Sequence, residues 1–466
     1  MKNRVSGIRV AVCAALSGCA HADLSSERDA LRAWQPSPVI QTGAAFEREA
    51  AEGPWMGVEL QRLDGALPRF VAYALKESPD LQAAHARWRA AVEGAAGAGR
   101  LPNPEVGYGG FVRSVETRVG PQLHRISLKQ AFPWPGRLGA ATDAMASAAA
   151  SAGDAFRAQV LVLVRNVASA YWELWQVERS HRIRLDHERI LTGLVETIQA
   201  RVETGEKSIA ELLQVQLRLQ SLRDHRTRHQ SLTRRHQARL LAAIGADPGL
   251  KIATTTTEPA VKLPAENLAS LREHVRRNPE VTRWTDLEAA RVSEARAART
   301  KRLPDFRVGA DYIVTGEAPI EGVAESGKDP IILSFGLTVP LWLGRYQSEI
   351  RQAESEATAA RASRRGAWLR VAAELEATVA RLFETHERIV RYEGTLIPQA
   401  EALQGSVNAA YEVGRAGVSE VLLALEEELE LRLELAEARA THARAWAELE
   451  RLTGRSLDGI EPGASS

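Results

Sequence analysis

Hydrophobic and polar residues alternate along two neighbouring stretches of the chain, residues 104–116 and 122–133, and the alternation returns at 305–315 and 331–341. A period of two over about ten residues predicts β-strands with one apolar and one polar face. Each predicted strand is about as long as an oblique crossing of a bilayer requires. The predicted apolar face consists of Val106, Tyr108, Val112, Ile126, Leu128, Phe132, Phe306, Val308, Ala310, Tyr312, Val314, Ile331, Leu333, Phe335, Leu337 and Val339.

The rest of the chain has the pattern of long helices. One is predicted over about 137–202, on the order of 100 Å at 1.5 Å per residue, and a second over about 345–412. Shorter helices are predicted at about 68–99, 209–244 and 279–302, and after the turn at Gly414. By length, we expect 209–244 and 279–302 to stack end to end, and the last helix to stack with 68–99. Two apolar faces per helix predict two neighbours, as in a closed ring.

The two halves of the chain repeat one another. Asn278-Pro279 follows Ser78-Pro79 by 200 residues, and Gly414 follows Gly205 by 209. A slowly drifting offset indicates an old duplication. We predict a first repeat at 67–249, a connector at 250–277, a second repeat at 278–454 and a tail at 455–466. The predicted fold is mainly α with a membrane β-barrel part, and each repeat has the order helix, strand pair, long helix, turn, helix.

The N-terminus has the pattern of a secretory signal, with basic residues before a short apolar stretch. Leu16-Ser17-Gly18-Cys19 resembles a bacterial lipobox. That resemblance implies removal of residues 1–18, acylation of Cys19 and sorting to the outer membrane. Residues 19–66 lack sustained periodicity and would form an extended, lipid-anchored tether. The alternative is an ordinary signal peptide cleaved near Ala22.

Composition narrows the class of function. The chain has 60 basic and 59 acidic residues, and removal of 1–18 would take away three basic residues and no acidic one, leaving a net charge of −2. This balance excludes a generic polyanion binder, so no nucleic-acid partner is expected. Cys19 alone would remain, which permits neither an intrachain disulfide nor a thiolate metal site. No phosphate loop, nucleophile elbow or HExxH motif occurs, so we expect neither an enzyme nor a cofactor.

Four strands cannot close a barrel, and an open sheet edge in lipid leaves backbone amides unsatisfied. Three copies of the chain would supply twelve strands, an even number within the range of bacterial barrels. Trp134 and Trp342 stand at equivalent places, where strand gives way to long helix, which is typical of aromatic residues at the membrane–water interface. The alternative is a pair of small soluble hairpins with capping tryptophans.

A resemblance to a known family rests on the duplicated order of elements, the lipobox, the Leu101-Pro102-Asn103-Pro104-Glu105 segment and the Phe132-Pro133-Trp134-Pro135-Gly136-Arg137 corner. By these features, the chain resembles TolC-type outer membrane factors over about residues 68–454. The chain is most similar to the branch that serves heavy-metal-efflux pumps (CzcC-like and CusC-like), because of the proline-rich corners. The resemblance implies a homotrimer in outer membrane lipid, with a β-barrel on an α-helical barrel. It also implies two partners, a periplasmic adaptor protein and, through it, an inner-membrane pump of the resistance-nodulation-division (RND) type.

Two tight turns carry the pattern that the resemblance identifies with the periplasmic tips, a glycine followed six residues later by an acidic residue. The resemblance implies that both turns dock onto the hairpin tips of the adaptor. In the alternative interpretation the glycines only end the helices and the polar residues face water. The docking residues are Gly205, Ser208 and Glu211 in the first turn, and Gly414, Arg415 and Ser419 in the second.

Glu420 matches a family position that lines the narrow tip entrance. Three copies would form a carboxylate ring, which favours cations. Leu423 replaces the family's second acidic residue, which argues against a strong double ring, and Glu420 could instead complement the dipole of the helix that it begins. By the family's use of such locks, Arg415 could pair with Glu211 and hold the entrance closed.

His225 and His229 have the i, i+4 spacing of metal ligands on a helix. Because the segment is rich in arginine, which repels cations, we interpret it as a solvated face and predict no metal site.

Three hypotheses for the function remain. The first is the exit duct of a tripartite RND-type pump, exporting heavy-metal cations. The second is the same channel serving drug efflux or type I protein secretion. The third is a periplasmic coiled-coil scaffold lipoprotein that forms no channel.

Overall fold

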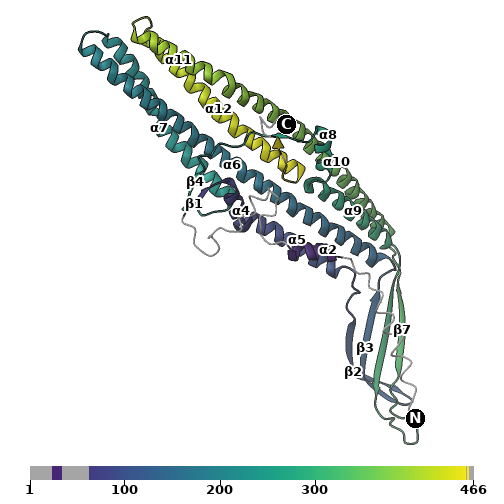
Figure 1. Cartoon of the computed structure of the whole chain (residues 1–466). Helices are drawn as coiled ribbons and strands as arrows, with labels where there is room; N and C mark the ends of the chain where they lie inside the picture. The colour runs from purple at the N-terminus through teal and green to yellow at the C-terminus, as the bar shows by residue number, and fades with distance from the viewer. Residues whose placement is uncertain (1–23, 34–61, 458, 461–466) are drawn as a thin grey trace. The chain divides into compact units, whose positions relative to one another are not determined.

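A computed structural model describes residues 24–33, 62–457 and 459–460 (Figure 1). Cys19 and the predicted signal peptide lie outside the described residues. The chain divides into two compact units. The first holds a four-stranded sheet and the helical segments next to it in sequence, and its described residues lie within 24–33, 86–154 and 282–366. The second is mainly helical and takes its described residues from 62–85, 155–281 and 367–460.

In the first unit, four antiparallel strands form one sheet in the order β2-β3-β6-β7. They are β2 (Glu105–Thr117), β3 (Gly120–Phe132), β6 (Asp305–Thr315) and β7 (Ile331–Thr338). The strands occur where the alternating pattern predicts them, although β7 ends three residues before 341, ahead of Pro340. The middle pair joins the two halves of the chain, since Phe132 lies opposite Phe306 and Ser127 opposite Asp311.

The predicted extended tether is wrong for part of its length. Residues 25–33 form helix α2 (Ser25–Ala33). The Trp88 indole donates a 2.9 Å hydrogen bond to the Glu27 carboxylate, so this helix is fixed to α5 (Pro79–Gly97). The irregular sequence around α2 hid its short helical period, because nine residues give few repeats to detect.

In the second unit, the helix predicted over 68–99 is divided into α4 (Leu67–Glu77) and α5 at Ser78-Pro79. The residue before a proline avoids the helical region, and Ser78 has an extended backbone with ψ 117°. This break receives the end of α7 (Ile209–Ile244). Gly245, with φ +70°, closes α7, and a Cβ on it would lie only 2.9 Å from Pro79 Cδ.

The second repeat has the same junction. Helix α12 (Val418–Thr453) ends at Gly454, which faces Pro279 at the start of α9 (Pro279–Thr300). The Asn278 side chain donates to the carbonyls of Arg451 and Leu452 at 2.7 and 2.9 Å. The expected stacking order was therefore wrong: α7 meets α5, and α12 meets α9. Helix lengths could not separate the two arrangements, because the repeats are nearly equal in length.

The two long helices differ in continuity. Helix α6 is unbroken over Arg137–Glu203, whereas the helix predicted at 345–412 consists of α10 (Leu343–Arg391), the π-helical segment η1 (Tyr392–Leu396) and α11 (Ile397–Glu412). The break lies just before Pro398, which lacks an N–H donor and would clash with the carbonyl four residues earlier in an α-helix. A π turn widens the helix there and relieves that clash.

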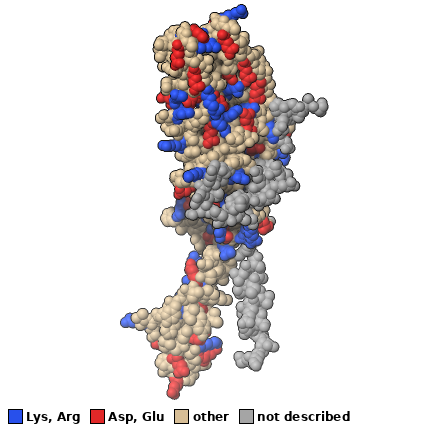
Figure 2. Space-filling view, turned by 60° about the vertical axis from the view of Figure 1, so that its left-hand side comes forward, with Lys and Arg blue, Asp and Glu red and all other residues tan. Residues whose placement is uncertain are grey.

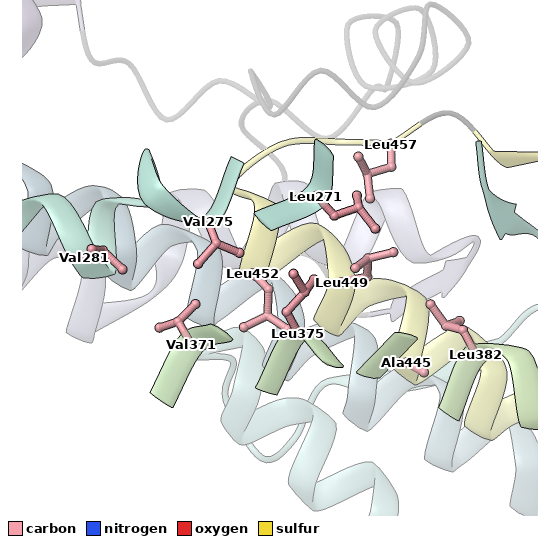
Figure 3. Packing of buried hydrophobic residues seen from close by; sticks show 10 residues of the cluster. All are labelled: Leu271, Val275, Val281, Val371, Leu375, Leu382, Ala445, Leu449, Leu452 and Leu457. Atoms are coloured by element: carbon pink, nitrogen blue, oxygen red, sulfur yellow. The ribbon is translucent and has the colours of Figure 1, made fainter. Parts of the chain in front are cut away.

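The predicted connector contains ordered structure. Strand β4 (Lys251–Thr254) pairs in parallel with β1 (Arg62–Gly65), and β5 (Leu263–Pro264) pairs with β8 (Gly459–Ile460), so the predicted tail is partly paired. Helix α8 (Leu268–Arg276) follows. Its Leu271 and Val275 enter a cluster of buried residues with α9, α10 and α12 (Figure 3). The cluster comprises Leu271, Val275, Val281, Val371, Leu375, Leu382, Ala445, Leu449, Leu452 and Leu457.

Candidate channel and tip surfaces

One face of the sheet is apolar and exposed. The strand register places its residues side by side, with Tyr108 opposite Ile126 and Ile126 opposite Tyr312. Leu333 is 82% exposed and Val106 is 77% exposed. The other exposed members of this face include Tyr108, Ile126, Leu128, Val308, Tyr312, Ile331, Phe335 and Leu337. Figure 2 shows acidic and basic side chains interspersed over the helices, whereas the sheet is mostly uncharged in that view. This face needs an apolar environment.

The opposite face carries mostly polar residues and glycines, together with Ile313 and Ile332, and is closely packed. Arg125 Nη2 lies 2.9 Å from Asp311 Oδ1, and only 4% of the Asp311 side chain is exposed. Gly107 faces Ser127 and Gly309 faces Ser334, and in each case a Cβ on the glycine would lie 2.6 Å from the serine Oγ. The recurrence of this glycine–serine pair in both halves agrees with the duplication. The alternation seen in the sequence therefore separates an apolar from a polar surface.

The joint between strand and long helix is held by Asp305. Its carboxylate accepts a 3.0 Å hydrogen bond from the Trp134 backbone N–H and pairs with Arg137 at 2.8 Å. The Trp134 ring stacks on Phe306 with a centroid distance of 5.6 Å. Trp342, at the equivalent place in the second half, is 76% exposed. The two predicted interface tryptophans thus have different surroundings within one chain.

Two helix ends form the candidate docking tips. Gly205 and Gly414 both have left-handed backbones, with φ +76° and +73°, which favour glycine. Ser208 is the N-cap of α7, and its Oγ accepts a 3.1 Å hydrogen bond from the Ala210 N–H. A shared buried cluster joins the helices of both tips. It comprises Leu191, Ile198, Val215, Leu219, Leu222, Tyr411, Val418, Val421 and Leu425.

The polar residues of the tips have partners that differ from those expected. Glu211 lies 3.8 Å from Lys207, whose ammonium stands 4.2 Å from the centre of the Tyr411 ring. Within the described part of the chain, Arg415 forms no ion pair. The expected Arg415–Glu211 pair is therefore not formed within one chain, because Glu211 forms an ion pair with Lys207, four residues earlier in the same tip. The Lys207–Tyr411 contact across the tips left no recognisable pattern in the sequence.

Glu420 caps its own helix. Its Oε2 accepts a 3.1 Å hydrogen bond from the Gly417 N–H at the start of α12. An acidic side chain there also complements the helix dipole. The neighbouring Ser419 hydroxyl donates a 3.2 Å hydrogen bond to Gln214 Oε1 on α7, which links the two tips. A role for Glu420 at the entrance remains a prediction.

Two histidines, His181 on α6 and His229 on α7, contact each other. His229 is not simply solvated, because its ring stacks on His181 at 3.8 Å with an interplanar angle of 9°. Glu188 forms ion pairs with Arg223 and Arg226 at 3.0 and 3.1 Å. Among the described residues, no group of three or more His, Cys, Asp or Glu side chains could hold a metal ion.

This histidine pair predicts loss of stability in acid. Burial, then the nearby Arg226 and Arg184, lower the pKa of His181, and burial, then His181 and Arg184, lower that of His229. The unfolded chain therefore binds protons more readily, so stability is full above about pH 6.5 and falls as the pH drops below it. We expect the unfolding temperature, followed by circular dichroism, to fall by a few degrees between pH 7.5 and 5.5.

The double variant His181→Gln/His229→Gln should flatten part of that pH dependence. His124→Gln, at an exposed position on the sheet, is the control for the loss of a histidine side chain outside the helical unit. Equal pH profiles for the native protein and the double variant would contradict the prediction.

None of the helices that the structure describes is both long and apolar enough to cross a membrane.

Comparison with known proteins identifies the family. The model described as "Outer membrane efflux protein" matches residues 71–246 and 275–455. The solved outer membrane protein VceC of Vibrio cholerae is 20% identical, with a TM-score of 0.69, over 84% of this chain and 97% of its own. The solved structure of CusC is 16% identical, with a TM-score of 0.72, over 84% of this chain and 92% of its own. The CmeC channel of Campylobacter jejuni is 13% identical, with a TM-score of 0.66, over 84% of this chain and 86% of its own. No curated protein matches the chain in sequence.

The family match covers more than half of the chain and includes both predicted repeats. The likeness of fold extends to TolC-type channels, as the sequence resemblance implied. Members of this family are outer membrane efflux channels and not enzymes. The chain belongs to the outer membrane efflux protein family.

Proposed function

We propose that three copies of this chain form the outer membrane exit duct of a tripartite RND-type efflux system. The observation that carries the proposal is the sheet, whose exposed apolar face includes Leu333 and Phe335. Its outer strands β2 and β7 each have only one neighbour among the described strands. In lipid, the unpaired backbone N–H and C=O groups at the two edges of the sheet need hydrogen-bond partners, which a closed barrel supplies. Three sheets joined edge to edge give twelve strands, with the polar face of Arg125 and Asp311 lining the lumen.

Ion conduction tests this proposal. The full chain, purified from outer membranes, should add stable conductance steps to a planar bilayer and migrate as a heat-sensitive trimer in mild detergent. Absence of both properties would favour the non-channel scaffold lipoprotein instead.

We further propose that the tips dock onto a periplasmic adaptor, which connects the duct to the inner-membrane pump. The left-handed turns at Gly205 and Gly414 leave Ser208 and Arg415 exposed just outside the helices, and Glu211 and Ser419 lie in the first turns of α7 and α12. Short exposed turns on a rigid helical support are suited to contact with a partner.

Glu420 is proposed to add negative charge at the tip entrance. Glu420→Gln should lower the cation-over-anion permeability ratio severalfold in single-channel recordings at low salt, because three carboxylates would be lost together. Glu412→Gln, at another exposed carboxylate near the second tip, is the matched control. Unchanged selectivity in Glu420→Gln would leave this residue with its capping role alone.

Heavy-metal cations are the proposed cargo, supported by the resemblance of the proline-rich corners to those of the heavy-metal-efflux branch. The protein is also proposed to be anchored by acylated Cys19. A deletion strain should become several times more sensitive to divalent metals and recover with the intact gene. Increased drug sensitivity with unchanged metal sensitivity would favour a drug channel, and loss of a secreted protein would favour type I secretion.

A further inference from the structure

The two tips differ in the solvent exposure of residues at equivalent positions of the two repeats. Helices α7 and α12 follow glycine turns 209 residues apart, Gly205 and Gly414, and end at glycines with the same spacing, Gly245 and Gly454. Adding 209 to a number on α7 therefore gives the equivalent position on α12.

Three positions on α7 form an apolar stripe with a spacing of four residues: Ile209, Leu213 and Leu217 are 65%, 58% and 74% exposed. Their equivalents on α12 are less exposed. Val418, the equivalent of Ile209, is 2% exposed and belongs to the buried cluster of the tips. The equivalent of Leu217 is Glu426, which pairs with Arg218 of α7. This face of the helix is thus covered by α7 in the second repeat and is exposed in the first.

The surface of α7 that covers α12 within one chain also has an equivalent in the second repeat. Within the chain, α7 presents Gln214 and Arg218 to Ser419 and Glu426 of α12. The positions equivalent to Gln214 and Arg218 are Leu423 and Glu427 on α12, and Leu423 is 65% exposed. The second repeat therefore exposes an apolar residue, Leu423, at the position equivalent to the α7 residue that contacts α12, and this residue can pack against the exposed stripe of α7.

We infer that the stripe of Ile209, Leu213 and Leu217 is covered by α12 of a neighbouring copy, with Leu423 of that copy against Ala210. This inference rests on the proposed trimer. The junction inside one chain supplies its geometry, since Ser419–Gln214 becomes Ala210–Leu423 under the offset of 209. The Ser419–Gln214 link of the internal junction is replaced by two apolar residues, and the Arg218–Glu426 ion pair by Glu427 and Leu217, which form no ion pair. Burial of apolar surface around Leu423 therefore holds this contact between copies.

A second copy is favoured over the adaptor as the occupant because the repeats carry both halves of the same contact. In a closed ring built from duplicated units, the face that each first repeat leaves bare meets the face that a second repeat leaves bare. An adaptor would have to match the stripe without that constraint.

Disulfide trapping in outer membranes tests the inference, in the resting channel without adaptor. Ala210→Cys/Leu423→Cys should give covalent dimers and trimers after mild oxidation, while each single substitution should not. The matched control, Gln214→Cys/Ser419→Cys, should link within one chain and keep the mobility of a monomer. As a second readout, Leu213→Glu/Leu217→Glu should lower the temperature at which the trimer dissociates.

The outcomes separate this inference from the proposed function. A trimeric, conducting protein whose control disulfide forms but whose 210–423 disulfide does not would overturn the contact and leave the duct in place. The same holds if a single cysteine at Leu213 reacts freely with a maleimide in the trimer and is protected only by an added adaptor. A protein that is monomeric and does not conduct would overturn both.

Discussion

Leu333→Arg should abolish assembly of the channel in the outer membrane, whereas Ile332→Arg should not. Leu333 lies on the apolar face and is 82% exposed, and Ile332, its neighbour on β7, lies on the opposite face and is 47% exposed. If the sheet is part of a closed barrel, an arginine at 333 faces lipid and costs about 2–4 kcal/mol per copy near the bilayer midplane. Three copies multiply that cost. An arginine at 332 would face the lumen and water.

The measurement is the amount of heat-sensitive trimer in isolated outer membranes, together with conductance in planar bilayers. Ile332→Arg should assemble and shift selectivity towards anions, because it adds positive charge to the lumen. Equal loss of trimer in both variants would show that the two faces do not differ in environment, which would contradict the barrel.

Arg451→Ala should cause a large loss of stability in the helical unit. The Arg451 side chain is 7% exposed and pairs with Glu280 at 2.7 Å and with Glu374 and Glu448 at 2.6 Å. Its removal leaves three carboxylates without their shared cation and takes away contacts between α12, α9 and α10. Breaking a buried pair costs about 3–5 kcal/mol, and the lower end applies because Glu374 is half exposed.

Arg272→Ala is the matched control, since Arg272 forms a single 2.5 Å pair with Glu376 and both side chains are about half exposed. Exposed pairs contribute about 1 kcal/mol or less. Thermal unfolding in detergent should therefore separate the variants clearly. Similar unfolding temperatures would mean that the Arg451 network adds little to stability.

The faces of the strands could be predicted because a period of two is a local signal. Tyr108, Leu333 and Phe335 on one face, and Arg125 and Ser127 on the other, need only alternation to be assigned. The duplication was also visible, since glycines and prolines at breaks keep their spacing. Their structural reason appears in the fold, where the final glycines of α7 and α12 face the first prolines of α5 and α9.

Contacts between distant segments could not be predicted in the same way. The stacking order of the shorter helices depends on how Asn278 caps α12, and no local pattern reports that contact. The expected Arg415–Glu211 pair was a choice among several charges, and Lys207, four residues before Glu211, was the closer cation. The Glu420 side chain satisfies a backbone N–H, a use that the sequence allowed but could not select.

The π turn at Tyr392–Leu396 makes the two repeats mechanically unlike. Helix α6 is an unbroken rod, and every residue of its interior can form the regular ladder of α-helical hydrogen bonds. The corresponding helix of the second repeat has wider, weaker bonding at one turn, and the Tyr392 hydroxyl there donates a hydrogen bond to Glu434 of α12. Bending stiffness is therefore lower in the second repeat, at a turn that is also hydrogen-bonded to α12. An elastic deformation of the helical part would concentrate at this turn, while the first repeat keeps its shape.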